Sequence, residues 1–507
     1  MSWFATTFSI ACSATQPVSG HLTDVYGRRN GLLLSYAFFL AGTLICGLAP
    51  KLSVFLLGRI LQGLGGGGIT SITAFLETDL VPIERRAFIE GLGNVAFGVT
   101  TALAGIYGGS VNDTIGWRWA FLIQVPAIAI MAGITAFVIK DPIQKINLSG
   151  WRQIDFVGGI SLLAATVLLQ LGLTTSMPTP VVCVSLPTAG ISFAIFVYWE
   201  LRVASHPVIP IAAMADCTVA LSQLSAFFAS ASYAGIIYYI PIYLQVTGNS
   251  SSKAGLRFIP LALAFGIGSF FSGLVVTATA RYYYVNLAIQ AVEVLAGSLI
   301  CTLTANTPSF APFIYLALLG LGEGGACVTI LMALLSATDG PNQTAVQAAV
   351  WSIKSIGSSL GVTAASKLFQ EIFSKALVNN LGSNSNTDIS MSVIQNITST
   401  LELPDDLSNQ SIKSGVLDAY MTGLRAVFFL SLGVVVLAAG LSLGIKNNLL
   451  SSSEDDLSEK GSDESDDTQS NTKSENVEQV SLSDDSSASI DFKADYGTKR
   501  RCLTGCF

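Results

Sequence analysis

Charged residues are scarce in this chain, and their scarcity excludes an ordinary soluble protein. Asp, Glu, Lys and Arg make up 12% of the 507 residues, about half of the roughly 25% that is usual for soluble domains. Hydrophobic residues make up 51%, and the mean hydropathy is +0.59. We therefore predict an all-α polytopic membrane protein surrounded by lipid, because a helix needs about 20 apolar residues to cross the bilayer core.

Histidine and clustered cysteine are also lacking. The chain has two histidines and eight scattered cysteines, none of them at metal-ligand spacing, so we expect no metal and no disulfide framework. There is no nucleotide-binding loop and no nucleophile–base constellation, which argues against an enzyme. Nothing suggests nucleic-acid binding, and the net charge of -7 mainly reflects acids concentrated after residue 450. No basic segment precedes the first apolar run, so we expect no cleavable signal peptide.

Long runs without charge recur along the chain and predict about thirteen transmembrane helices. If successive spans alternate sides, then Arg85, Lys140, Arg202 and Arg281 fall on the same side as Arg28. Short loops rich in Lys and Arg stay in the cytoplasm, so we assign that side to the cytosol. The predicted spans lie near 3–22, 31–49, 53–76, 90–111, 118–139, 155–174, 180–201, 219–245, 254–278, 285–304, 310–335, 346–370 and 422–445.

A short charged turn joins the first two apolar runs and holds Gly20, Asp24, Gly27, Arg28 and Arg29. The glycines allow a tight turn, and Asp24 can pair with Arg28 one helical turn later. The spacing G-x-L-x-D-x-x-G-R-R resembles the loop signature between the second and third transmembrane helices of the major facilitator superfamily. The resemblance implies two helical lobes that rock about a central site, with this turn as a conformational-switch loop.

Only one apolar run precedes the turn, whereas the family has two helices there. We therefore expect that helix one is missing from the sequence, through a truncated gene model, an alternative start or a genuine loss. Adding that helix would bring the count to the fourteen spans of the family's drug/proton antiporter branch.

The third apolar run contains Arg59 and, one turn later, Gln62. An Arg at membrane depth costs about 2.5–3.5 kcal/mol on insertion scales, so its side chain should face a polar interior. The pair resembles the R-x-x-Q-G-x-G pattern of the family's helix four, which implies a role in proton coupling. The alternative is an Arg that snorkels to the headgroups or only makes structural hydrogen bonds. Asn94, in the next run, joins these two as a pathway candidate.

Two further stretches resemble the antiporter branch. Gly105, Gly108 and Gly109 occupy the glycine-rich motif of helix five, with Gly105 in place of the usual proline. Residues 112–126, which include Trp117 and Trp119, are similar to the fungal vacuolar basic amino acid transporters. The two tryptophans also suit plain anchors at the membrane interface.

The second half of the chain places ionisable residues inside apolar runs: Glu293, Glu323 and Lys354. Such residues are expensive in a membrane and mark functional sites by default. We expect Glu323 to bind a cation or a proton; a structural Glu323–Lys354 ion pair is the alternative. Tyr238 is a candidate for lining the pathway, although an aromatic stripe more often reflects packing.

The composition divides the chain into four parts: an N-terminal lobe at 1–139 that lacks helix one, two inserted linker helices at 140–217, a C-terminal lobe at 218–446 and a disordered acidic cytosolic tail at 447–507. Within the second lobe we predict a lumenal loop at 371–421. The glycosylation candidates Asn249, Asn396 and Asn409 fall on the lumenal side.

The resemblance to this family and to its antiporter branch implies a proton-coupled antiporter, powered by a proton gradient and needing no cofactor. We expect a monomer that moves small cationic substrates, namely the basic amino acids Lys, Arg and His, into the vacuole across the vacuolar membrane. Two alternatives remain: a plasma-membrane multidrug/proton antiporter and a transport-dead, transporter-like receptor.

Overall fold

The computed structural model is helical throughout the part of the chain that it describes. That part comprises residues 2–139, 155–173, 179–204, 214, 216–247, 256–308, 310–338, 343–382 and 410–447. The glycosylation candidates Asn249, Asn396 and Asn409 and the predicted tail from residue 448 onward lie outside it.

Each predicted span coincides with a helix in the described part of the chain, except that α5 and α6 together form one span, Trp117–Val138. The all-α fold and the positions of the spans are therefore as predicted. The helices are α1 Ser2–Tyr26, α2 Arg28–Leu48, α3 Leu52–Leu80, α4 Ile83–Thr114, α5 Trp117–Leu122, α6 Gln124–Val138, α7 Phe156–Leu173, α8 Thr179–Arg202, α10 Cys217–Val246, α12 Ile259–Thr279, α13 Tyr283–Cys301, α14 Ala311–Ser336, α15 Gln343–Gly382 and α17 Gln410–Ser442.

Among the residues that the structure describes, ten helical spans are long and apolar enough to cross a membrane, and α7 is apolar but shorter. Helices α1 and α15 fall short of that hydropathy because they carry buried polar side chains, among them Ser13, Gln16, Gln347 and Ser352. The two helices pack against each other. Their polar faces are therefore turned towards other helices rather than lipid.

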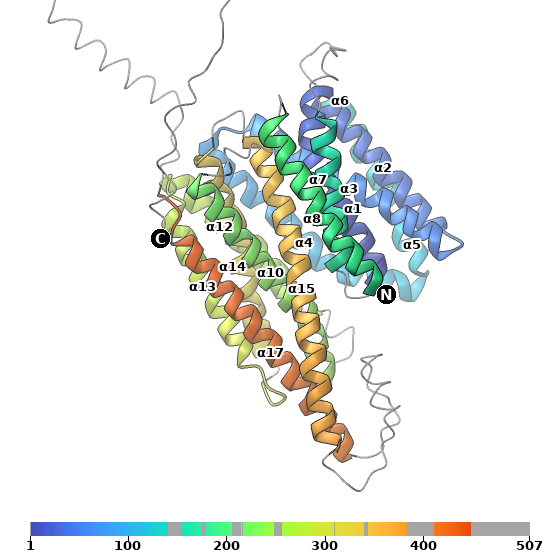
Figure 1. Ribbon diagram of the computed structural model, residues 1–507, viewed down its shortest axis with the longest axis vertical. Coiled ribbons are helices and arrows are strands. Elements are labelled where there is room, and N and C mark those ends of the chain that lie inside the picture. Colours follow the sequence, from blue (N-terminus) through green and yellow to red (C-terminus); the bar gives the residue numbers. More distant parts are fainter. Residues whose placement is uncertain are drawn as a thin grey trace, which may run out of the picture. The chain divides into compact units, whose positions relative to one another are not determined.

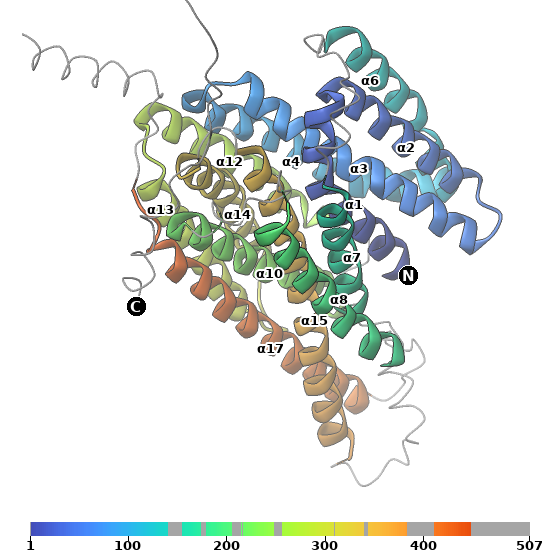
Figure 2. The ribbon, with the colours of Figure 1, turned by 45° about the horizontal axis from the view of Figure 1, so that its top comes forward.

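The helices form two groups joined along two seams (Figure 1). Helices α1, α2, α3 and α6 pack together in the first group, and α4 joins it through α5, which contacts both α2 and α4. Helices α10, α12, α13, α14, α15 and α17 pack together in the second group. One seam is the contact of α1 with α15. The other is the long contact of α4 with α12, which run side by side (Figure 2). The α7–α8 pair packs on α1 and α15, next to the first seam.

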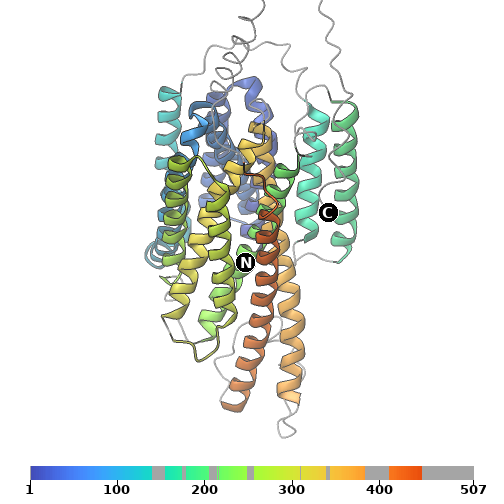
Figure 3. The same cartoon turned by 90° about the vertical axis from the view of Figure 1, so that its left-hand side faces the viewer.

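Helices α15 and α17 run together past their neighbours (Figure 3). Phe369, Phe373 and Leu377, spaced one turn apart, are fully buried against Val416 and Tyr420. Both helices therefore reach into the stretch 371–421 that the sequence assigned to a loop, because an apolar stripe continues beyond the last uncharged run. Of that stretch, residues 383–409 lie outside the described residues.

Candidate functional site

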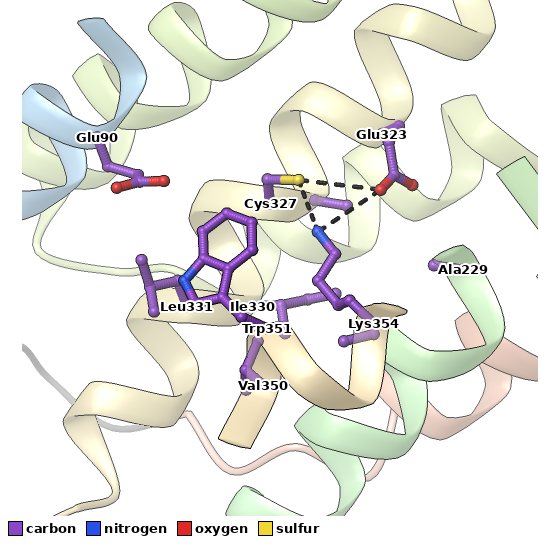
Figure 4. Close-up of a pocket in the computed structure, with 11 residues that line it drawn as sticks. Glu90, Ala229, Glu323, Cys327, Ile330, Leu331, Val350, Trp351 and Lys354 are labelled. Atoms are coloured by element: carbon purple, nitrogen blue, oxygen red, sulfur yellow. Dashed lines mark hydrogen bonds and ion pairs between the residues drawn. The ribbon is translucent and has the colours of Figure 1, made fainter. Parts of the chain in front are cut away.

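A small cavity lies where α4, α10, α14 and α15 meet. It has a volume of about 20 Å³, enough for a single water molecule. The polar residues around it are Glu90 on α4, Glu323 and Cys327 on α14, and Trp351 and Lys354 on α15. Figure 4 shows Glu323, Cys327 and Lys354 turned towards one another. The i, i+4 spacing of Glu323 and Cys327 places both on one face of α14.

Lys354 is held by two groups from α14. Its Nζ lies 3.6 Å from Glu323 Oε1 and donates to Cys327 Sγ at 2.9 Å. The ammonium also lies 5.7 Å from the centre of the Trp351 ring. The side chains of Lys354 and Glu323 are 18% and 7% exposed, so neither charge is well hydrated and each depends on the other.

Glu90 brings a second carboxylate to the same cavity, from the other helix group. Asn94 Nδ2 lies 3.4 Å from Glu90 Oε1, and the charges of Glu77 and Lys354 act on Glu90. The cavity therefore has acids from both helix groups and one lysine. Sequence reasoning missed Glu90 because it opens the predicted span 90–111, where an acid resembles an ordinary helix-start residue. The neighbouring Gly91 was a signal in the sequence, because small residues mark close helix contacts, and Gly91 lies on the face of α4 that contacts α12.

Glu293 lies near Glu323 but is not among the residues that line the cavity. It is fully buried on α13, and Gly322, the residue before Glu323, packs on it so closely that a Cβ there would lie 2.9 Å from Glu293 Cβ. The structure thus forms the Glu323–Lys354 ion pair that the sequence raised as the alternative, and it places Glu293 beside that pair, a contact that the sequence did not predict.

Arg59 and Gln62 contact each other within the first helix group, apart from the cavity. Arg59 Nη1 donates to Gln62 Oε1 at 2.6 Å, and Gln62 donates to Thr43 Oγ1 at 3.1 Å. The guanidinium lies 4.6 Å from the centre of the Phe8 ring. Arg59 therefore faces α1 and α2, and it is not among the residues lining the cavity.

Two other candidates lie apart from the cavity. Tyr238 is 51% exposed and packs edge-on against Tyr239. On α4, a Cβ at Gly108 would meet nothing within 4 Å, while the surroundings of Gly105 and Gly109 lie outside the described side chains. Their roles remain predictions.

In the predicted switch loop, Gly27 has a φ of +86°, which favours glycine. Arg28 Nε pairs with Asp79 Oδ2, at the end of α3, at 2.9 Å. Arg29 Nη2 donates to the carbonyl of Ala136 at 2.5 Å. The sequence suggested Asp24 as the partner of Arg28; the side chains of Gly20 and Asp24 lie outside the described ones, and the partner seen is Asp79.

Arg86 joins the two helix groups at the same end as Arg28. It donates to the carbonyl of Thr78 at 2.6 Å and to Gln343 Oε1, at the start of α15, at 2.7 Å. Thr78 Oγ1 donates to Gln347 Oε1 at 2.8 Å. We call these two inter-group hydrogen bonds, from Arg86 to Gln343 and from Thr78 to Gln347, the latch.

Breaking the latch should open the Arg28 end. Replacing Gln343 and Gln347 by Ala removes both bonds, each worth about 0.5–1.5 kcal/mol and more for the charged donor, so the open population should rise about tenfold or more. Faster hydrogen–deuterium exchange at the end of α3 and the start of α15 would report it. Thr73→Ala is the control, because Thr73 Oγ1 bonds only the carbonyl of Ile69 in its own helix; equal exchange in both variants would contradict the latch.

The chain matches known transport proteins. The family model described as Major Facilitator Superfamily matches residues 1–362. The crystal structure of the human organic anion transporter MFSD10 superposes with a TM-score of 0.58 at 15% identity, covering 87% of this chain and 83% of that one. At this identity the likeness shows the fold alone.

Three relatives cover most of the chain. The vacuolar membrane amino acid uptake transporter fnx2 of Schizosaccharomyces pombe is 30% identical over 89% of this chain and 78% of its own length. The multidrug resistance protein fnx1 of the same yeast is 27% identical over 90% and 87%. The vacuolar basic amino acid transporter 2 of Saccharomyces cerevisiae is 26% identical over 75% and 84%.

Proposed function

Because the chain belongs to the major facilitator superfamily and is an integral membrane transporter, we propose that it is a proton-coupled antiporter that carries basic amino acids into the vacuole. The observation that carries the proposal is the buried Glu323–Lys354 pair, which faces Glu90 across the seam between the helix groups. We propose further that it works as a monomer.

The charges around the cavity complement a basic amino acid. Lysine and arginine carry two positive groups and one carboxylate, and histidine does so when its ring is protonated. The cavity offers Glu90, Glu323 and Lys354. The substrate cations would meet the two acids, and its carboxylate would meet Lys354. Because the cavity of about 20 Å³ is too small for an amino acid, the two groups must separate at one end before the substrate enters.

Proton coupling follows from competition for Glu323. While Glu323 is ionised, it holds Lys354 and can hold a substrate cation. A proton bound to Glu323 removes both attractions, which releases the substrate and leaves Lys354 to the acid of the other group, Glu90. The protein therefore binds the proton with different affinities in the two arrangements of its helix groups, as alternating access requires.

A multidrug/proton antiporter is the second candidate, supported by the similarity to fnx1. Trp351 beside Lys354 could bind a flat organic cation through its ring face. The two candidates share the acids and differ in whether the substrate carboxylate matters.

Uptake into vacuolar vesicles with an imposed proton gradient tests both candidates. We expect labelled Lys, Arg and His to accumulate at least about tenfold above an uncoupled control, a free-energy coupling of about 1.4 kcal/mol or more. Excess unlabelled basic amino acid should compete, whereas leucine should not. Decarboxylated lysine should compete weakly if Lys354 binds the carboxylate. Accumulation of organic cations instead of amino acids would support the multidrug alternative.

A further inference from the structure

Helix α13 carries a polar face that the proposed substrate site does not use. Asn286, Gln290 and Glu293 follow one another at one-turn spacing and therefore lie on one side of the helix. Their exposed fractions are 1%, 1% and 0%. Burying three polar side chains, one of them ionisable, in the interior of a membrane protein costs free energy. Residues of this kind therefore mark a functional site.

Most polar atoms on this face have no partner among the described residues. Both carboxylate oxygens of Glu293, both polar atoms of the Gln290 side chain and Nδ2 of Asn286 are buried without a hydrogen bond. Asn286 Oδ1 accepts from Thr329 Oγ1, on α14, at 3.0 Å. Buried polar groups are normally bonded to protein or to ordered water, so this face is suited to a short chain of water molecules.

The groups around Glu293 determine its charge. Glu323 from α14, Tyr233 from α10 and the charge of Lys354 from α15 act on Glu293, and Thr329 from α14 bonds Asn286. From α17, the apolar Leu432 and Val435 lie next to Gly297. Lys354 is the one cation in this described set, and Glu323 holds it at 3.6 Å. A fully buried carboxylate without a partner is stable only with its proton bound, so Glu293 is the neutral acid of the group.

The polar face also has a direction. Asn286 lies in the first turn of α13, next to Tyr282, whose hydroxyl donates to the carbonyl of Lys446 at the end of the described chain. Gln290 and Glu293 follow over about 10 Å at the helical rise of 1.5 Å per residue. At the deep end, Gly322 abuts Glu293 and Glu323 comes next in the chain, with its Oε2 also unpartnered.

We propose that Glu293 is a second protonation site and that Asn286 and Gln290 form, with water, the path by which protons pass between Glu293 and the Arg28 end of the protein, apart from the substrate cavity. In the transfer step, the Glu293 carboxylic acid gives its proton to water along Gln290 and Asn286, through which the proton leaves at the Arg28 end, and the Glu293 carboxylate then takes the proton of the Glu323 carboxylic acid. Glu323, ionised again, holds Lys354 and can hold the next substrate cation. The inference rests on the proposed proton-coupled function.

The test separates coupling from substrate binding. Glu293→Gln and Gln290→Leu are compared in gradient-driven uptake and in exchange of labelled for unlabelled substrate without a gradient. We expect Glu293→Gln to lose gradient-driven uptake at least about tenfold while exchange stays within about twofold, and Gln290→Leu to slow uptake but not exchange. Leu295→Ala, at a position that is 51% exposed on the same helix, should match the wild type.

Three results overturn the proposal without touching the proposed function. The first is gradient-driven uptake by Glu293→Gln at the wild-type rate. The second is the loss of both exchange and uptake in both variants when each protein is present at normal abundance. The third is unchanged uptake by Gln290→Leu with a normal proton-to-substrate ratio. Absence of any wild-type uptake would instead overturn the proposed function.

Infrared spectra of the purified protein give an independent test, because a protonated carboxyl group has its own absorption band. Glu293→Gln should remove this band, and an unchanged band would contradict the assignment. If Glu293→Gln does not fold, Glu293→Asp replaces it and should shift the band.

Discussion

Glu323→Gln is expected to lower gradient-driven uptake at least about tenfold and to destabilise the protein by up to about 3–5 kcal/mol, because it leaves the buried Lys354 ammonium without its counter-charge. Uptake by vesicles measures the first effect, and thermal unfolding of the purified protein measures the second. The destabilisation follows from desolvation: Lys354 keeps the Cys327 contact at 2.9 Å, but a thiol is only a weak hydrogen-bond acceptor.

Two further variants isolate the buried charge. The double variant Glu323→Gln, Lys354→Gln removes both charges and should recover most of the stability while remaining unable to couple uptake to the gradient. The matched control is Glu371→Gln, which breaks the Glu371–Lys375 pair; its N–O distance is 2.7 Å, but its side chains are 65% and 71% exposed, so uptake and stability should both stay unchanged. Equal effects of Glu323→Gln and Glu371→Gln would refute a special role for the buried pair.

Gly98→Leu should abolish transport by wedging the seam between α4 and α12. Gly91 and Gly98 on α4 lie against the backbone of α12, and Gly266 and Gly273 on α12 lie against the backbone of α4, with the two glycines of each helix spaced seven residues apart. A Cβ at Gly98 would press on the carbonyl oxygen of Ala262, and one at Gly266 would lie 2.9 Å from Val95 Cα. Backbone atoms cannot rotate away as side chains can, so a larger residue must force the helices apart, at a cost of about 1–3 kcal/mol or more.

Gly93→Leu is the control for this seam, because it makes the same change on the same helix. A Cβ at Gly93 meets nothing within 4 Å, so uptake should stay near the wild-type rate, and uptake by Gly98→Leu should fall at least about tenfold. Both variants are compared at equal amounts of monodisperse protein. Similar uptake by the two would show that close contact of α4 with α12 is not needed for transport.

The candidate site was only partly predictable. Glu293, Glu323 and Lys354 were found from the sequence because an ionisable residue in an apolar run is conspicuous by itself. Glu90 and Cys327 were missed, because neither residue is unusual within its own helix. The contact of Arg28 with Asp79 was missed as well, since Asp79 lies 51 residues away in the chain; the pairing of Arg28 with Asp24 stays a prediction.

The order of the residues was enough to predict a helical membrane protein, the positions of its helices and the residues that are costly inside them. Those properties depend on neighbours along the chain, and the 20-residue length of a membrane span makes them recognisable. The contacts between helices came from the fold: α4 lies on α12 and α1 on α15, and Glu90 faces the Glu323–Lys354 pair. Which helices pack together depends on side-chain shape where they cross, and small residues such as Gly98 permit close approach there. The hydropathy of the sequence contains no information about those shapes.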